Sequence, residues 1–175
     1  MKQEIYLETN RLYIRKITEQ DDQYFLRWLT DPEVTTHVGG PRPEKSIKET
    51  IDRALKNWAE LGFGPGMVIS KDEGEVVGVS GISKVDIEGN DEFDLGYLID
   101  KNHWNKGFAF EISSGIVNKA SSHNLSALTA MIHPKNTISI RIVDKLGFNF
   151  EKSVNQIGGK GVSDPINLYK HKISS

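Results

Sequence analysis

The sequence contains no cysteine and no apolar run that approaches the roughly 20 residues needed to cross a membrane. The absence of cysteine excludes a disulfide scaffold, a thiol nucleophile, a cysteine-ligated zinc site and an iron–sulfur cluster. A strong charge of one sign is also lacking, because 24 acidic residues face 22 Lys and Arg and leave a net charge of -2. Nucleic-acid-binding domains are usually strongly basic, so we expect no nucleic acid partner. The first residues do not form the apolar stretch of a signal peptide, and we expect a cytoplasmic protein with no membrane partner.

The residues that are present have the composition of a folded domain. The chain has 175 residues, of which 37% are hydrophobic and 26% are charged. A chain of this length buries enough surface to fold without disulfides or a metal ion. Because the sequence shows neither an internal repeat nor a long linker, we expect a single domain over residues 1–175.

The spacing of hydrophobic residues predicts an α/β fold. Apolar and polar residues in strand patterns predict strands over 11–17, 67–69, 75–79, 93–99, 126–133, 148–154 and 165–173. Helical spacing predicts a helix that ends at residue 31, and further helices over 43–61, 108–120 and 136–146. The order is therefore β-α-α-β-β-β-α-β-α-β-β, and residues 93–133 should form a parallel strand pair with a right-handed crossover. Antiparallel hairpins on both sides complete a mixed sheet covered by helices.

Two surface features are also predicted. The basic side chains of Arg11, Arg15 and Lys16 are interpreted as a solvated strand face. Residues 158–161, which are rich in glycine, are expected to form a flexible loop between the last two strands.

The segment with the clearest chemical content runs from residue 97 to residue 111. A predicted strand leads into a short loop, and a helix begins near Gly107. The first N–H groups of a helix are unpaired and carry the positive end of its dipole, so they can hold a phosphate or pyrophosphate. Gly107 permits close approach of a ligand, and Ala109 keeps the next turn slim. Taken alone, the segment is interpreted equally well as an ordinary helix entry that uses glycine.

Two motifs follow one another along the second half of the chain. Residues 104–109 read Trp-Asn-Lys-Gly-Phe-Ala, and Asn136 and Ser139 precede Lys-Leu-Gly-Phe at 145–148. In these motifs, their order and their spacing, the sequence resembles the GNAT superfamily of N-acetyltransferases, and specifically its RimJ/RimL-like branch. Segments 7–12 and 31–34 extend the resemblance over nearly the whole chain. Asn105 departs from the pattern, because the branch commonly has glycine there, and we expect it to reshape the turn.

The resemblance implies a fold and a co-substrate. It implies a GNAT acyl-CoA N-acyltransferase fold whose central parallel strands, here 93–99 and 126–133, splay apart, with acetyl-CoA as the co-substrate. Pantetheine would pair with backbone in the gap, and the pyrophosphate would lie on the loop amides. Asn136 would orient the pantetheine, and a role as helix N-cap is compatible with this. The implied cofactor-binding residues are Tyr97, Leu98, Ile99, Trp104, Asn105, Lys106, Gly107, Phe108, Ala109 and Asn136.

The acid that protonates the leaving thiolate cannot be a tyrosine in the last helix. Val143 occupies the position at which many GNAT enzymes carry that tyrosine. Ser139 lies one turn earlier and faces the same way. The resemblance implies that Ser139 is the acid, and the alternative is that Ser139 only caps the helix or binds the cofactor.

The base that removes a proton from the acceptor amine has several candidates. Asp94 lies on the strand that approaches the thioester, Glu92 lies two residues earlier, and either could act through a water molecule. His37 and His133 have side chains of suitable pKa, although His133 fits a structural role equally well. No histidine pair has the spacing of metal ligands, so we expect no metal.

These features predict direct transfer of an acetyl group from acetyl-CoA to a primary amine, because no nucleophile for an acyl-enzyme is recognised. The favoured acceptor is the α-amine of a protein N-terminus, whose deprotonation at pH 7 costs about 1–1.4 kcal/mol against roughly 4–5 kcal/mol for lysine. A small-molecule amine is the alternative, and a non-catalytic acyl-CoA sensor or interaction module is an alternative of another class. The acceptor should enter near residues 35–40 and 158–161, where no acidic cluster favours a polyamine. The protein is expected to be a monomer or a homodimer.

Overall fold

The computed structural model describes residues 4–158 and 160–173. In this part of the chain eight strands form one mixed sheet in the order β1-β2-β3-β4-β5-β6-β8-β7, with an additional pairing of β4 with β7. The strands are β1 (Ile5–Glu8), β2 (Leu12–Lys16), β3 (Gly66–Ser70), β4 (Val76–Ile87), β5 (Asn90–Ile99), β6 (Ala127–Ile132), β7 (Asn149–Ile157) and β8 (Lys160–Lys172). The helices are α1 (Asp22–Leu29), α2 (Pro32–Thr35), α3 (Glu44–Leu61), α4 (Phe108–Ala120) and α5 (Thr137–Lys145), with short 3₁₀ turns η1 (Glu19–Asp21), η2 (Lys101–His103) and η3 (Ser121–His123).

The mixed α/β architecture predicted from the hydrophobic spacing is confirmed, with two additional elements. Strand β1 pairs antiparallel with β2 and extends the edge of the sheet. Helix α2 is a single turn that begins at Pro32, and the Asp31 side chain accepts hydrogen bonds from the N–H groups of Glu33 and Val34. Both elements are only four residues long, so neither contains enough residues to display a hydrophobic period.

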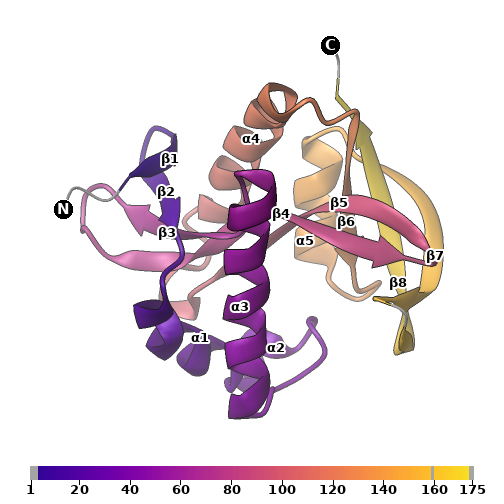
Figure 1. Ribbon diagram of the computed structural model, residues 1–175, viewed down its shortest axis with the longest axis horizontal. Helices are drawn as coiled ribbons and strands as arrows, with labels where there is room; N and C mark the ends of the chain where they lie inside the picture. The colour runs from indigo at the N-terminus through magenta and orange to yellow at the C-terminus, as the bar shows by residue number, and fades with distance from the viewer. Residues whose placement is uncertain (1–3, 159, 174–175) are drawn as a thin grey trace.

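Helices cover both faces of the sheet (Figure 1). Alternation along β3 shows how the faces differ, because Met67 and Ile69 pack with α1 and α3, whereas Val68 packs in the cluster that contains residues of α4. Helix α3 contributes Ile47 and Ile51 to the first cluster. The sheet is therefore buried on both sides in its middle, and its strands are held in place from each face.

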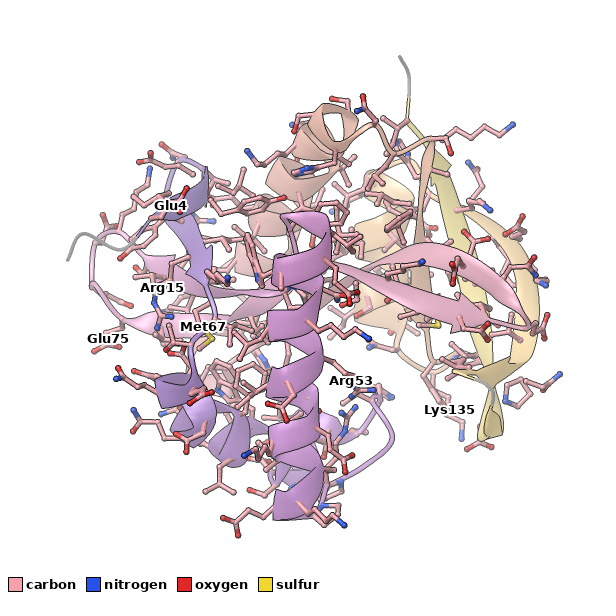
Figure 2. The ribbon with its side chains drawn as sticks, in the orientation of Figure 1. Glu4, Arg15, Arg53, Met67, Glu75 and Lys135 are labelled. Carbon is pink, nitrogen blue, oxygen red and sulfur yellow. The ribbon has the colours of Figure 1, made fainter. Side chains whose placement is uncertain are left out.

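The prediction of a solvated strand face is wrong for Arg15, because this residue is only 8% exposed. Its guanidinium donates to both carboxylate oxygens of Asp21, at 2.6 and 2.8 Å, and ties β2 to the start of α1 (Figure 2). Burial by itself raises the pKa of Asp21, but hydrogen bonds from Arg15 and Thr18 outweigh it and hold that pKa below its ordinary value. Arg11 is likewise engaged, since it pairs with Glu111 of α4 at 2.7 Å.

The central strands β5 and β6 are parallel, as predicted, and they separate almost at once. Their register within the described chain is confined to the pair Asp94 and Thr129. In contrast, β5 pairs with β4 along its whole length, from Asn90 to Ile99. The splayed arrangement that the family resemblance implies is therefore present, and it opens toward the end of β5 that leads into α4.

The glycine-rich segment between the last strands is a hairpin end. Strands β7 and β8 pair as far as Ile157 and Lys160, and Gly158 donates its N–H to the Asp86 carbonyl at 2.8 Å. Residue 159 of the predicted loop lies outside the described residues. The hairpin thus leans on the end of β4, where Ile87 pairs with Ile157. No helix in the described part of the chain is both long and apolar enough to cross a membrane.

Candidate active site

The edge of β5 that faces β6 is formed by alternate residues. Asp100 donates its N–H to the carbonyl of Val77 at 2.9 Å, so this pair occupies a hydrogen-bonded position of the β4–β5 ladder. Because such pairs alternate along an antiparallel ladder, the backbone of Leu98 also faces β4, and that of Tyr97 and Ile99 faces the gap. Leu98 is thereby removed from the predicted backbone contacts to pantetheine.

Trp104 closes the loop that follows β5. Its indole N–H donates to the carbonyl of Ile99 at 2.7 Å, while the residue as a whole is 39% exposed. Because this bond uses the Ile99 carbonyl, three backbone groups face the gap and can bind a ligand there. They are the Ile99 N–H and the N–H and carbonyl of Tyr97. Trp104 was predicted to bind the cofactor, and the role that the structure gives it is to hold the loop against the end of β5.

The backbone of the loop has the conformation of an anion-binding turn. Asn105 and Gly107 both have positive φ, at 62° and 78°, and α4 begins at Phe108. A left-handed residue followed by a helical one points successive N–H groups toward a common point. Asparagine tolerates the left-handed region better than most residues, so Asn105 keeps the backbone conformation that glycine favours. The structure therefore gives no support to the prediction that Asn105 reshapes the turn.

Side chains of the loop are largely committed to packing. Phe108 is 7% exposed in the main core cluster, with Ala109 packed against that cluster. The guanidinium of Arg11 lies over the Phe108 ring, 4.9 Å from its centroid. Phe108 and Ala109 can therefore offer a ligand only their backbone N–H groups, whereas Lys106 adds a cation that is 40% exposed.

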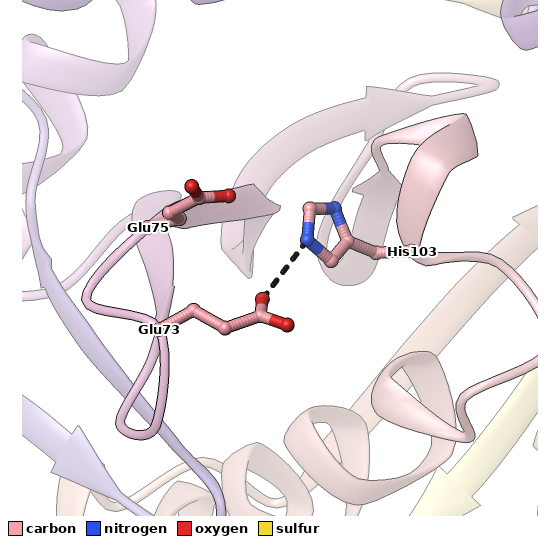
Figure 3. A group of neighbouring side chains, drawn as sticks. All are labelled: Glu73, Glu75 and His103. Carbon is pink, nitrogen blue, oxygen red and sulfur yellow. Dashed lines mark hydrogen bonds and ion pairs between the residues drawn. The ribbon is translucent and has the colours of Figure 1, made fainter.

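A polar cluster anchors the same loop to the β3–β4 turn (Figure 3). Ligand atoms of Glu73, Glu75 and His103 lie within 4.8 Å of one another, a proximity that sequence spacing does not reveal. His103 Nε2 is 3.2 Å from Glu73 Oε2, and Lys106 Nζ is 3.6 Å from Glu73 Oε1. Since Glu73 already has two nitrogen partners on the loop, we assign the cluster the task of holding residues 103–106, and the absence of a metal stays a prediction.

Asp100 is an anchor that sequence reasoning missed. Its buried carboxylate accepts from the Trp28 indole N–H at 2.8 Å and from the Arg27 guanidinium, and so joins the end of β5 to α1. Burial raises the pKa of Asp100, but the donors from Trp28 and Asn102 and the charge of Arg27 hold it below its ordinary value. An aspartate directly after a strand and before a loop was the available signal.

Ser139 and Asn136 lie at the start of α5, as predicted. Asn136 caps the helix, because its Oδ1 accepts from the Ser139 N–H at 3.1 Å. The Ser139 hydroxyl in turn accepts a hydrogen bond from the Tyr97 hydroxyl, at 2.9 Å. Burial raises the pKa of Tyr97 and the bond to Ser139 partly offsets it, so Tyr97 stays protonated and available as a donor. The hydroxyl of Tyr97 was not among the predicted catalytic groups, because only its backbone was considered.

Asp94 lies where β5 and β6 part. Its Oδ1 accepts from the Met131 N–H of β6 at 2.9 Å, so the side chain fills the place of a backbone partner. Burial raises the pKa of Asp94 to about 8, against the opposing bonds from Met131 and Thr129. A carboxyl group with such a pKa becomes able to accept a proton as the pH rises through about 8.

The other base candidates are placed differently. Glu92 pairs with Lys170 of β8 at 3.0 Å, which commits its charge to the neighbouring strand. His37 and His133, which are far apart in sequence, stack with ring centroids 5.7 Å apart. Neither histidine is among the residues that line the cavity between the N-terminal helices and strands β4 and β5.

A cavity of about 710 Å³ lies between the helices of the N-terminal half and strands β4 and β5. Asp94 and Tyr97 line it, and so do Val38 from the segment after α2 and Gly158 from the β7–β8 hairpin. The two segments expected to admit the acceptor therefore both border this cavity. Its wall also contains Arg42 and Arg53, which sequence reasoning missed because isolated arginines on a helix and in a loop give no signal.

Comparison with known proteins identifies the family. The acetyltransferase (GNAT) domain family matches residues 11–149. The uncharacterized N-acetyltransferase p20 of Bacillus licheniformis is 31% identical over 148 residues, which cover 83% of each chain. An acetyltransferase from Agrobacterium tumefaciens superposes with a TM-score of 0.81 at 26% identity, over 98% of this chain and 95% of that one. The chain belongs to the GNAT family of acetyltransferases, and the predicted class of enzyme is confirmed.

More distant structures share the fold and differ in their named acceptors. An acetyltransferase from Salmonella typhimurium, described as modifying the N-terminal serine of a ribosomal protein of the 50S subunit, has a TM-score of 0.75 at 13% identity, over 98% of this chain and 100% of that one. The spermidine N-acetyltransferase of Vibrio cholerae, solved with CoA and spermine, has a TM-score of 0.73 at 12% identity, over 93% and 96%. At these identities the likeness concerns the fold alone and does not identify the acceptor of this protein.

Proposed function

We propose that the protein transfers an acetyl group from acetyl-CoA directly to a primary amine, and that this amine is the α-amine of a protein N-terminus. The observation that carries the proposal is the set of polar groups at the point where β5 and β6 separate. Asp94 faces the cavity there, and the hydroxyl of Tyr97 reaches Ser139 on α5. A proton acceptor and a proton donor thus lie three residues apart on β5, with their side chains on opposite faces of the sheet beside the gap.

The residues around the gap fit an acyl-CoA. The backbone of Tyr97 and the Ile99 N–H are turned into the gap, where an amide-containing arm can pair with them. Beyond them the positive φ angles of Asn105 and Gly107 direct loop amides toward the start of α4, which suits a pyrophosphate. Both features support the site that the family resemblance implies, including the N-cap Asn136 beside it.

The same groups provide for the proton transfers of the reaction. The amine nitrogen forms a bond to the acetyl carbon, and the bond from that carbon to sulfur breaks. Asp94 receives the proton that the amine gives up, directly or through a water molecule, because its raised pKa makes it a stronger base than an exposed aspartate. Tyr97, through Ser139, supplies a proton to the departing sulfur in place of the tyrosine that Val143 replaces.

The choice of an α-amine rests on the strength of the base. A group with a pKa of about 8 removes a proton readily from an α-amine of similar pKa, but less readily from a lysine side chain near 10.4. The cavity accepts the first residues of a peptide or a small amine, since pockets of this volume hold ligands of either kind. A small-molecule amine is therefore the second candidate.

The test uses four peptides of one sequence with a single internal lysine, either free or blocked at the N-terminus, with and without that lysine replaced by glutamine. Release of CoA thiol and mass spectrometry of the peptide report the reaction and its position. We expect acetylation at the N-terminus of both free peptides and none on the blocked ones. Acetylation of lysine on the blocked peptide would overturn the α-amine choice, and activity confined to small amines would favour the second candidate. Binding of acetyl-CoA without transfer to any amine would favour a non-catalytic sensor.

A further inference from the structure

Two arginines line the acceptor cavity on the side of the N-terminal helices. Arg42 lies just before α3 and is half-buried, and Arg53 projects from α3 itself toward the side of the molecule that carries β5 and β6 (Figure 2). Both approach one neutral oxygen, because Arg42 Nη1 is 3.5 Å and Arg53 Nη2 is 3.4 Å from the Thr50 hydroxyl. Two guanidinium groups thus converge on a single point of the cavity wall.

Neither cation has a carboxylate partner in the part of the chain that the structure describes. Among the residues that the structure describes, no Asp or Glu forms an ion pair with Arg42 or Arg53. The two lysines that line the same cavity are paired, Lys84 with Asp91 at 2.7 Å and Lys56 with Glu60 at 3.7 Å. The unpaired positive charge of the cavity lining is therefore that of the two arginines, and Asp86 is a lining carboxylate without an ion pair among the described residues.

Electrostatics around Arg42 point in the same direction. Burial lowers the pKa of Arg42, and the neighbouring charge of Arg53 lowers it further. Two like charges that partly lose water repel each other, and an anion placed between them relieves both costs. Guanidinium groups are the side chains best matched to a carboxylate, because they donate two parallel hydrogen bonds.

The position of the pair relates it to the reaction. The cavity that contains Arg42 and Arg53 also contains Asp94 and Tyr97, so one molecule can place its amine at Asp94 and its other end at the arginines. We propose that Arg42 and Arg53 form an anion-binding subsite that selects acceptors carrying a carboxylate in addition to the reacting amine. This inference rests on the proposed function, and it narrows the acceptor to an acidic amine. A polyamine is disfavoured, since its second cation would face the two guanidinium groups.

The carboxylate has two possible sources, and the experiment separates them. One arm compares a longer peptide that begins Ala-Asp with the same peptide beginning Ala-Asn, both amidated at the C-terminus. The other arm compares a free dipeptide with its C-terminal amide. We expect kcat/KM to favour the acidic member of at least one arm by about tenfold or more, which is the effect of one charge-assisted hydrogen bond. Preference in the first arm identifies an acidic side chain near a protein N-terminus, and preference in the second identifies a free carboxylate.

The variant Arg53→Gln removes one guanidinium at an exposed position of α3, and Lys45→Gln on the same helix is the matched control for loss of one positive charge. We expect Arg53→Gln to reduce the preference to about threefold or less, mainly through a lower kcat/KM for the acidic peptide. Lys45→Gln should keep the full preference. Arg42→Gln should act like Arg53→Gln, and the exposed position of Arg53 keeps the test valid if Arg42→Gln fails to fold.

Equal kcat/KM for acidic and neutral members in both arms would overturn the subsite while leaving the acetyltransferase function intact. Should no peptide be acetylated, the proposed acceptor class fails, and binding of fluorescent acidic and neutral peptides then tests the subsite on its own. A preference for the acidic peptide that Arg53→Gln abolishes supports it, and equal binding overturns it. Tighter binding of phosphate than of carboxylate peptides would also overturn the assignment of a carboxylate.

Discussion

At the scale of single residues, Asp94 joins structure and chemistry. Its carboxyl replaces a missing backbone partner for Met131 of β6, and it borders the acceptor cavity. Asn in this position keeps an oxygen that can accept from the Met131 N–H, but it cannot take up a proton. The substitution Asp94→Asn therefore separates the two tasks.

For Asp94→Asn we expect kcat to fall by about 100-fold, with the affinity for acetyl-CoA unchanged. Because the pKa of Asp94 is about 8, wild-type activity should rise with pH through that value. The variant should lose the part of this rise that belongs to Asp94 and keep only the part caused by titration of the acceptor amine. Initial rates between pH 6 and pH 9 measure both effects. The control Glu92→Gln should cost much less, since Glu92 is held by Lys170, and the opposite ranking would contradict the assignment of the base.

The same substitution has a consequence for stability. The folded pKa of Asp94, about 8, exceeds the value near 3.9 of an unfolded chain, so the folded protein binds more protons between these values. The free energy of unfolding then falls as pH rises from about 4 to about 8. Asp94→Asn should make that fall less steep in urea titrations at several pH values, and an unchanged slope would mean that Asp94 is not the titrating group.

The hydroxyl groups of Tyr97 and Ser139 form a second pair of proposed catalytic groups. If the two act as one proton relay, Tyr97→Phe and Ser139→Ala should each lower kcat by about tenfold or more, and the double variant should lose little beyond either single one. Acetyl-CoA affinity should change by less than about twofold in each, as judged by calorimetry. A loss limited to cofactor affinity would mean that Ser139 positions the cofactor and protonates nothing.

At the scale of elements, the loop before α4 determines how the start of that helix is presented. Trp104 braces the loop to the end of β5, and the cluster of Glu73 and His103 braces it to the β3–β4 turn. Gly107 sits at the N-cap of α4 with φ of 78°, and the nearest atom to an added Cβ would be Arg11 Nη2 at 3.5 Å. Space is therefore available at Gly107, and its backbone conformation and its charge environment are what a substitution would change.

We expect Gly107→Glu to weaken acetyl-CoA binding by about tenfold or more, because a carboxylate would stand beside the pyrophosphate at the positive end of α4. Gly107→Asn is the matched control, since asparagine tolerates the left-handed conformation and adds no charge, as Asn105 does two residues earlier. Calorimetric titration of both folded variants checks the expectation. Equal affinities for the wild type and Gly107→Glu would remove the pyrophosphate from this loop.

At the scale of the whole molecule, the sheet separates the two proposed binding regions, which meet at Asp94 and Tyr97. The gap between β5 and β6 suits the acyl-CoA, and the cavity beneath α1 and α3 suits the acceptor. Both substrates can therefore be bound at once, and the chain has no cysteine to hold the acetyl group between two half-reactions.

This arrangement predicts a ternary complex. Initial rates measured over a grid of acetyl-CoA and peptide concentrations should give intersecting double-reciprocal lines. No acetylated form of the enzyme should accumulate when acetyl-CoA is added without an acceptor, which intact-protein mass spectrometry can check. Parallel lines together with an acetylated protein would contradict direct transfer.

The sequence by itself determined the features that depend on neighbouring residues. Helical periodicity located α3 and α4 to within a residue or two, and strand patterns located β5 and β6 to within about three residues, because both signals repeat within a few residues. The strand predicted over 75–79 was too short, since β4 continues to Ile87. The loop at 104–109 and the cap at Asn136 were recognisable because each is formed by residues that are neighbours in the sequence. The four-residue elements β1 and α2 were missed, since a single turn or a short edge strand contains no repeat.

Only the tertiary structure decided which distant groups meet. The raised pKa of Asp94 comes from burial against β6, and the Tyr97 hydroxyl finds Ser139 42 residues away. In the sequence Arg15 has the pattern of a surface charge, and only the structure shows that it pairs with Asp21. Likewise, only the structure shows that Arg42 and Arg53 lie on the wall of one cavity. Burial, desolvation and charge pairing depend on three-dimensional distance, and residues far apart in the chain have no local pattern that records it.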